Sequence, residues 1–296
     1  MAQIRLRYSG FVNFAGKILS ILTGLVFTLT VTRRLSTSDF GIWALIGSLG
    51  WYFTWPSWMI NFWTTRYTAR DVANAPMTAI TTNLIISAAA ALLYLPFGIF
   101  VADQTGVDRT PFILYGIFIA LSFIETTLES IANAKRPQSI GFAFFSFEIA
   151  KVMCGLALVA SLRLGLVGVV LSIVLALAVQ ISILFLRLWD LILHGGVEWS
   201  LARRWVRHGW LAVYNGLPPV VGGLDRLIVV ILAGATISVA YIGAAGTFSA
   251  IIGFGSSLAI ALYPRLLSGG AKRDIETVLR MGLMFMIPAS LGIIWL

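Results

Sequence analysis

The chain has 296 residues, of which 59% are hydrophobic and only 11% are charged, and its mean hydropathy is +0.93. This composition excludes a protein whose main solvent is water. The formal net charge of +9 does not indicate a nucleic-acid partner, because the Lys and Arg residues form short clusters between apolar stretches, a pattern that sets membrane topology.

Apolar stretches follow one another from Phe11 almost to the end of the chain. A helix of about 20 residues crosses the hydrocarbon core of a bilayer, and most of these stretches reach that length. They are apolar on every face, whereas the strands of a membrane barrel alternate apolar and polar residues. The sequence therefore predicts an all-α polytopic membrane protein with about nine transmembrane helices. These helices span Phe11–Val31, Phe40–Trp63, Ala79–Val101, Phe112–Ala132, Ile140–Leu162, Leu164–Leu188, Leu211–Leu232 and Val239–Leu262, with a ninth that begins near Gly282.

The distribution of basic residues predicts the orientation of these helices. With the N-terminus in the cytoplasm, most Lys and Arg residues of the connections lie on the cytoplasmic side, and the opposite side keeps only Arg33, Arg34, Arg109 and Arg163. The positive-inside rule therefore predicts a multi-pass protein of the inner (cytoplasmic) membrane with a cytoplasmic N-terminus. The cytoplasmic connection 194–209 mixes apolar and basic residues, as an amphipathic helix on the membrane surface does.

An internal repeat relates the two parts of the chain. A shift of 199 residues places Leu35–Ala44 on Gly234–Gly243, so that the first three helices fall on the seventh, eighth and ninth. An even number of helices separates the copies, which gives both the same orientation in the membrane. The predicted domains are a six-helix N-lobe over 1–193, the amphipathic connection over 194–209 and the start of a parallel C-lobe over 210–296.

Three stretches of the sequence are similar to one known family. In Thr32–Ala44, a basic pair and Leu precede a short polar turn, Asp39, an aromatic residue, Gly and Trp. The other two stretches are Gly223–Pro264 and Pro288–Gly292, which look like the seventh to ninth helices of the family. In these features the chain resembles the polysaccharide-type flippases of the multidrug/oligosaccharidyl-lipid/polysaccharide exporter superfamily.

This resemblance implies two helical lobes that face a central cavity and alternate between inward-open and outward-open states. The implied cargo is a polyprenyl-pyrophosphate-linked oligosaccharide, as used for O-antigen and other polysaccharides, and the implied neighbours are membrane lipid, polysaccharide polymerases and glycosyltransferases. The family has more helices than the nine predicted here, and the last apolar segment, Leu283–Leu296, is shorter than the ~20 residues of a span. We therefore expect the chain to be truncated at its C-terminus.

Two pairs of ionisable residues lie inside predicted helices, where a charge is costly and usually faces protein or water. Glu148 and Lys151 share a helix face and can pair, which either fastens their helix to a neighbour or places them in the cavity. Glu125 and Glu129 repel each other unless a proton or a cation intervenes, which allows H⁺ or Na⁺ coupling, although Glu129 can also be simply hydrated. The ion-coupling candidates are Glu125, Glu129, Glu148 and Asp225.

A pyrophosphate that crosses the bilayer loses water and needs cationic partners. The candidates for binding it are Lys17, Lys151, Arg226, Arg33 and Arg34. Lys17 can also extend back to the interface. Asp225 and Arg226 point about 100° apart on one helix, so they cannot both face one partner. Arg33 and Arg34 can receive the head group on release or can equally meet solvent and lipid phosphate.

No motif indicates catalysis, a metal or a cofactor. The sequence has no His-Glu-x-x-His, Cys-x-x-Cys or Asp-x-Asp pattern, and its one cysteine, Cys154, lies in an apolar helix. We therefore expect no enzyme activity, no metal site and no cofactor. The second helix carries four tryptophans, which either stack on sugars or contact lipid and other helices. These are Trp51, Trp55, Trp58 and Trp63.

The leading hypothesis is transport of a lipid-linked oligosaccharide by alternating access. A multidrug or cation antiporter of the same superfamily is the alternative, favoured if acidic residues dominate the cavity. A membrane-embedded glycosyltransferase is a third hypothesis, but it needs loop carboxylates, and the connection 194–209 holds only Glu198.

Overall fold

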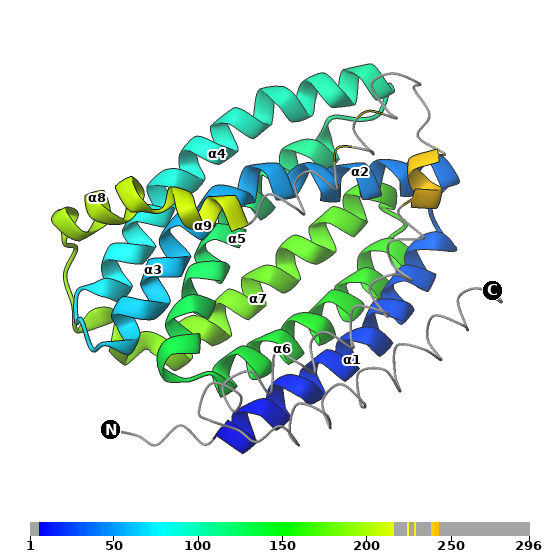
Figure 1. Cartoon of the computed structure of the whole chain (residues 1–296). Helices are drawn as coiled ribbons and strands as arrows, with labels where there is room; N and C mark the ends of the chain where they lie inside the picture. Colours follow the sequence, from blue (N-terminus) through cyan, green and yellow to red (C-terminus); the bar gives the residue numbers. More distant parts are fainter. Residues whose placement is uncertain (1–5, 216–223, 225–227, 229–237, 243–296) are drawn as a thin grey trace, which may run out of the picture. The chain divides into compact units, whose positions relative to one another are not determined.

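The computed structural model describes residues 6–215, 224, 228 and 238–242 of the chain. The chain divides into two compact units, Met1–Ala240 and Tyr241–Leu296, and the helices below all belong to the first unit. Every regular element among the described residues is a helix (Figure 1). This confirms the predicted all-α polytopic membrane fold.

The first two predicted helices become three α-helices. Helix α1 covers Leu6–Thr32, and after a short turn α2 covers Thr37–Thr54. A 3₁₀ segment, η1 (Trp55–Ser57), then leads into α3, which covers Trp58–Ala69. The prediction of one continuous helix over Phe40–Trp63 is therefore wrong. Pro56 lacks a backbone N–H and its ring crowds the preceding turn, so the α-helical hydrogen-bond pattern breaks there.

The next four predicted helices are present at nearly the predicted places. They are α4 (Ala75–Thr105), α5 (Thr110–Lys135), α6 (Gln138–Gly155) and α7 (Gly165–Leu193). A π-helical stretch, η2 (Leu156–Ser161), extends α6. Within the described part of the chain, α4, α5, α7 and α6 with its extension are long and apolar enough to cross a membrane. Most of the predicted seventh and eighth helices, and all of the ninth, lie outside the described residues.

The turn between α6 and α7 is short because two residues take a left-handed backbone conformation. Arg163 has a φ of 55° and Gly165 a φ of 57°. Glycine adopts this conformation readily, whereas a residue with a Cβ does so at some cost. The chain therefore reverses direction within a few residues and places α7 against α6.

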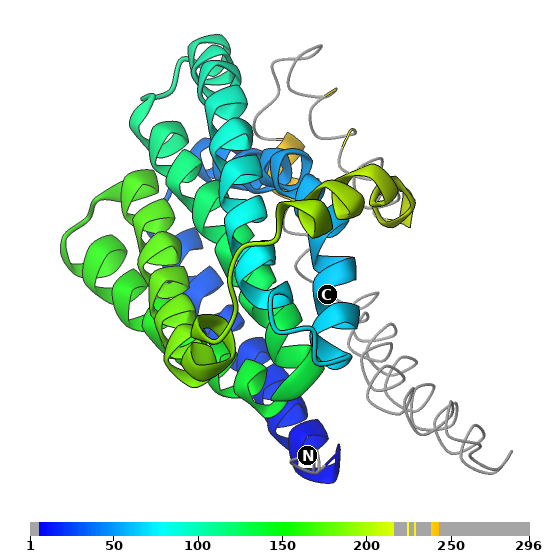
Figure 2. The ribbon, with the colours of Figure 1, turned by 90° about the vertical axis from the view of Figure 1, so that its left-hand side faces the viewer.

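Helix α7 packs extensively against α5 and α6, while α6 also packs against α1 and α5 against α4. Figures 1 and 2 show these five helices side by side. The main core cluster lies between α2, α4, α5 and α7, and its fully buried members include Ile42, Leu49, Tyr94 and Ile119. This packing determines which faces of α5, α6 and α7 lie against neighbouring helices, and some of these faces carry ionisable side chains.

The connection after α7 forms α8 (Trp199–His208), which is followed by α9 (Trp210–Asn215). Figure 1 shows α8 beside α3 and α4. The apolar side chains Leu201 and Trp205 are buried in a cluster with residues of α3 and α4. Trp199 and Val206 remain exposed together with the arginines of the helix. The helix is therefore amphipathic, but part of its apolar face contacts protein.

Ser36 caps the N-terminus of α2, within the stretch that resembles the flippase pattern. Its Oγ accepts a hydrogen bond from the Asp39 N–H at 3.0 Å and donates one to Asp39 Oδ2 at 2.8 Å. We expect Ser36→Ala to lower the free energy of unfolding by about 1 kcal/mol, because a backbone donor loses its partner. Titration of the purified protein with SDS measures this change, with Ser36→Thr as the control that keeps the hydroxyl. Equal stability of Ser36→Ala and the wild type would contradict the role of the cap.

Candidate functional site

Glu148 and Lys151 form an ion pair on α6. The Lys151 Nζ lies 2.7 Å from Glu148 Oε2, and only 2% of the Glu148 side chain is exposed. The carboxylate also accepts hydrogen bonds from two hydroxyls of α1, Ser20 Oγ at 3.1 Å and Thr23 Oγ1. The pair therefore joins α6 to α1.

The surroundings of the Lys151 ammonium are aromatic. Its Nζ lies 5.2 Å from the ring centre of Phe147 and 5.8 Å from that of Phe27. Both distances are within the range of a cation–π interaction. The ammonium therefore contacts the Glu148 carboxylate and two aromatic rings, as the cation of a structural ion pair does. Its contact with a pyrophosphate stays a prediction.

Glu125 and Glu129 lie on the face of α5 that packs against α7. Gln180 of α7 donates through Nε2 to Glu125 Oε1 at 2.8 Å and to Glu129 Oε1 at 3.4 Å. Gln180 is 3% exposed. The two carboxyl groups therefore share one amide donor. Among the described residues, no Lys or Arg side chain forms an ion pair with Glu125 or Glu129, and the Gln180 amide connects the two carboxyl groups.

A buried polar network joins α3, α4 and α5. Asn83 of α4 is 1% exposed, and its Nδ2 donates to Asn61 Oδ1 at 2.9 Å and to Thr127 Oγ1 at 2.6 Å. Thr127 Oγ1 also lies 3.3 Å from Asn61 Oδ1. The sequence analysis missed this network. Its local signals are the amides of Asn61 and Asn83, which both lie within predicted transmembrane helices.

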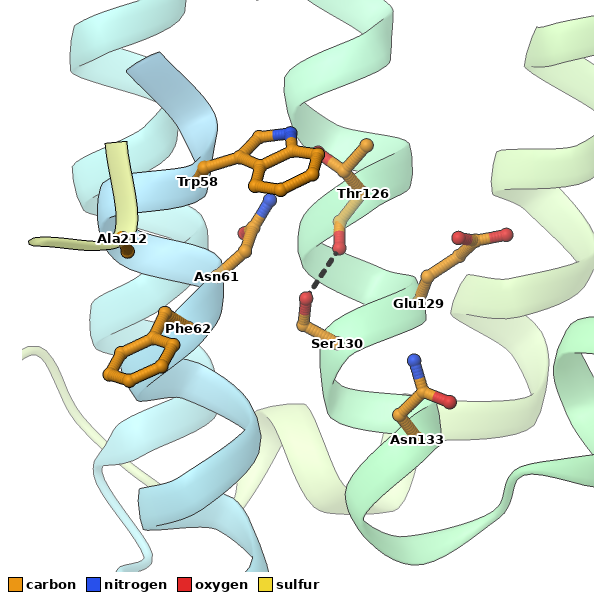
Figure 3. Close-up of a pocket in the computed structure, with 8 residues that line it drawn as sticks. All are labelled: Trp58, Asn61, Phe62, Thr126, Glu129, Ser130, Asn133 and Ala212. Atoms are coloured by element: carbon orange, nitrogen blue, oxygen red, sulfur yellow. Dashed lines mark hydrogen bonds between the residues drawn. The ribbon is translucent and has the colours of Figure 1, made fainter. Parts of the chain in front are cut away.

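A pocket of about 310 Å³ lies beside this network, and we call it the α3–α5 pocket. Its lining residues come from α3, α5 and α9 (Figure 3). They are Trp58, Asn61, Phe62, Thr126, Glu129, Ser130, Asn133 and Ala212. In Figure 3 the Trp58 indole projects from α3 toward α5, whereas the Glu129 carboxyl group turns away from α3. Glu129 therefore links the pocket wall to the acidic cluster on the far side of α5.

Of the remaining predicted site residues, Arg33 and Arg34 are described, and they do not join these groups. Arg33 and Arg34 are exposed in the turn between α1 and α2. The side chain of Lys17, and all of Asp225 and Arg226, lie outside the described residues. No three His, Cys, Asp or Glu side chains come together as a metal site within the part of the chain that the structure describes.

A comparison of the sequence with protein-family models gives no match, and a comparison with curated proteins gives none either. Solved structures are similar to the chain. One shows the inward-facing conformation of a multidrug resistance MATE family transporter of the MOP superfamily. It is 14% identical over 96% of this chain and 72% of its own, with a TM-score of 0.67.

Two further structures show the same relationship. The MATE multidrug transporter DinF-BH is 14% identical over 97% of this chain and 71% of its own, with a TM-score of 0.63. A MOP superfamily transporter from Pyrococcus furiosus, described by the reverse polarity of its binding pocket, is 14% identical over 97% of this chain and 70% of its own, with a TM-score of 0.52. Similarity at such low identity establishes architecture, and the chain therefore has the fold of the MATE transporters of the MOP superfamily.

Proposed function

We propose that the protein moves polyprenyl-pyrophosphate-linked oligosaccharides across the inner membrane by alternating access. The observation that carries transport is the fold, which the chain shares over 96% of its length with an inward-facing transporter. The sugar-lipid cargo is supported by the sequence pattern of Thr32–Ala44, which resembles that of polysaccharide-type flippases. In this proposal the N-terminus is cytoplasmic, and polysaccharide polymerases or glycosyltransferases act beside the protein.

The cations that we assign to the pyrophosphate are Arg226, Lys17 and the pair Arg33 and Arg34. Arg33 and Arg34 are exposed at the end of α1 and form no ion pair with another described residue, so their guanidinium groups are available to a phosphate. Lys151 is a weaker candidate, because its ammonium already contacts Glu148 and two aromatic rings.

A multidrug or cation antiporter is the second candidate function. The observation that favours it is the Glu125–Glu129–Gln180 cluster, in which two carboxyl groups of one membrane helix accept from the same amide. Such a cluster can bind a proton and a cation in turn, as an antiporter requires. Exchange of a proton also suits an oligosaccharide flippase that is driven by an ion gradient. The two candidate functions therefore differ in their cargo and not in the use of an ion gradient.

Transfer of a fluorescent polyprenyl-pyrophosphate oligosaccharide across proteoliposomes tests the proposal. We expect Arg226→Gln and the double variant Arg33→Gln, Arg34→Gln to slow transfer by about tenfold each, since a hydrogen bond to a charged group contributes roughly 1.5 kcal/mol or more. Arg109→Gln is the control, because Arg109 lies on the same side by prediction but pairs with Asp103 at 2.7 Å. Equal rates in all variants would remove the assigned anion contacts.

A further inference from the structure

The amide of Asn61 has a fixed orientation at the wall of the α3–α5 pocket. Its Oδ1 accepts from Asn83 Nδ2 at 2.9 Å and lies 3.3 Å from Thr127 Oγ1. Because the Asn83 amide donates to this oxygen, the opposite edge of the Asn61 amide carries the Nδ2 donors. In the described part of the chain, Asn61 Nδ2 has no hydrogen-bond partner, and Figure 3 shows it turned toward the indole of Trp58. The buried network therefore presents a donor to the pocket.

Trp58 and Asn133 add an aromatic face and a second amide. Trp58 is 42% exposed, and its indole extends from α3 toward α5 (Figure 3). Asn133 is exposed on α5 at the same pocket. A ring face beside amide groups is suited to a ligand that is apolar on one face and carries hydroxyl or amide groups at its edge. A saccharide ring has this shape and this chemistry.

An organic cation fits the same walls less well. The guanidinium of Arg66 lies 3.8 Å from the ring centre of Phe62, so a cation already covers one face of the second aromatic ring of the pocket. Glu129 supplies the one carboxyl group of the lining, but that group turns away from α3 and contacts Gln180. An organic cation in the pocket therefore meets one uncovered aromatic ring, that of Trp58, and no carboxylate that faces it.

We propose that the α3–α5 pocket binds a saccharide ring, which makes it the subsite for the sugar part of the cargo. The proposal rests on the function proposed above and adds the place where the sugar binds. The ring stacks on Trp58, and its hydroxyl or acetamido oxygens accept from Asn61 Nδ2 and from the Asn133 amide. The volume of about 310 Å³ lies at the small end of the ~300–1,000 Å³ range of ligand pockets, which suits a small part of an oligosaccharide.

Saccharide binding to the purified full-length protein tests this subsite. The probes are glucose, galactose, mannose and N-acetylglucosamine, with tetraphenylphosphonium as the cation probe, and saturation-transfer NMR gives the affinities. At least one sugar should bind the wild type. Trp58→Ala should weaken it by up to about tenfold, because an aromatic stacking contact contributes roughly 0.5–1.5 kcal/mol. Asn133→Ala should weaken it severalfold through the loss of a hydrogen bond.

Two matched variants separate this site from a general effect on folding. Trp58→Phe keeps an aromatic face and should retain most of the affinity. Trp51→Ala removes an exposed tryptophan of α2 that does not line the pocket, and it should leave the affinity unchanged. The inference is overturned if no sugar binds the wild type, if Trp58→Ala binds sugar as the wild type does, or if tetraphenylphosphonium alone binds and Trp58→Ala abolishes its binding.

The transfer assay distinguishes failure of this subsite from failure of the proposed function. If the wild type transfers no lipid-linked oligosaccharide, the proposed function fails, whatever the pocket binds. If the wild type transfers its cargo and Trp58→Ala does so at the same rate with unchanged sugar affinity, only the assignment of the pocket fails. Slower transfer by Trp58→Ala with normal transfer by Trp51→Ala supports both.

Discussion

Glu148→Ala is expected to lower the free energy of unfolding by about 3 to 5 kcal/mol, the effect of removing one partner of a buried ion pair. The substitution leaves the Lys151 ammonium, whose side chain is 13% exposed, without a counter-charge. It also removes the acceptor of Ser20 and Thr23, so α1 loses its polar contact with α6. SDS titration of the purified protein measures the change.

The double variant Glu148→Gln, Lys151→Met supplies the control for that prediction. It removes both charges while it keeps the length of the side chains, so it should recover most of the lost stability. Asp103→Ala breaks an exposed pair with Arg109 and should change stability little. Wild-type stability of Glu148→Ala would show that the pair does not fasten α6 to α1. Normal cargo transfer by the stable double variant would show that neither residue acts in the cavity.

The double variant Glu125→Gln, Glu129→Gln is expected to abolish the response of transport to an ion gradient. Two amides cannot take up a proton or carry the negative charge that binds a cation, whereas carboxyl groups can do both. A gradient of one pH unit stores about 1.4 kcal/mol per proton, which is a factor of ten in the cargo ratio across the membrane for each proton exchanged. The wild type should show this response in proteoliposomes, and the variant should show the same cargo ratio with and without the gradient.

Asp103→Asn is the matched control for the coupling prediction, because Asp103 is an exposed carboxylate at the end of α4. The same measurement with a Na⁺ gradient identifies which ion the cluster takes. A double variant that still responds to either gradient as the wild type does would exclude Glu125 and Glu129 from coupling.

Most of the helical fold could be predicted from the apolar runs, because a segment in lipid must satisfy its backbone hydrogen bonds internally. Helices α4, α5 and α7, and α6 together with its extension η2, begin and end within a few residues of their predicted places. Pro56 interrupts the second predicted helix, and the hydropathy of the sequence there gives no sign of it. The chain then continues as α3 to Ala69, because Thr64 and Thr68, which are polar in the sequence, are buried against protein.

The site could be predicted only where its contacts are local. The spacing of Glu148 and Lys151 on one helix indicates their ion pair, since residues three apart share a helix face. Their partners on α1 are 125 or more residues away in sequence, and so no local pattern shows them. The same is true of Gln180 beside Glu125, and of Asn61 beside Asn83, because tertiary packing brings these side chains together.

The measurement that tests the central claim most directly compares two cargoes in the same proteoliposomes. One is a fluorescent polyprenyl-pyrophosphate oligosaccharide, and the other is a fluorescent organic cation. We predict that the full-length protein transfers the sugar-lipid faster than protein-free liposomes do and leaves the cation at the protein-free rate. Transfer of the cation without transfer of the sugar-lipid would contradict the proposed function and would favour the antiporter.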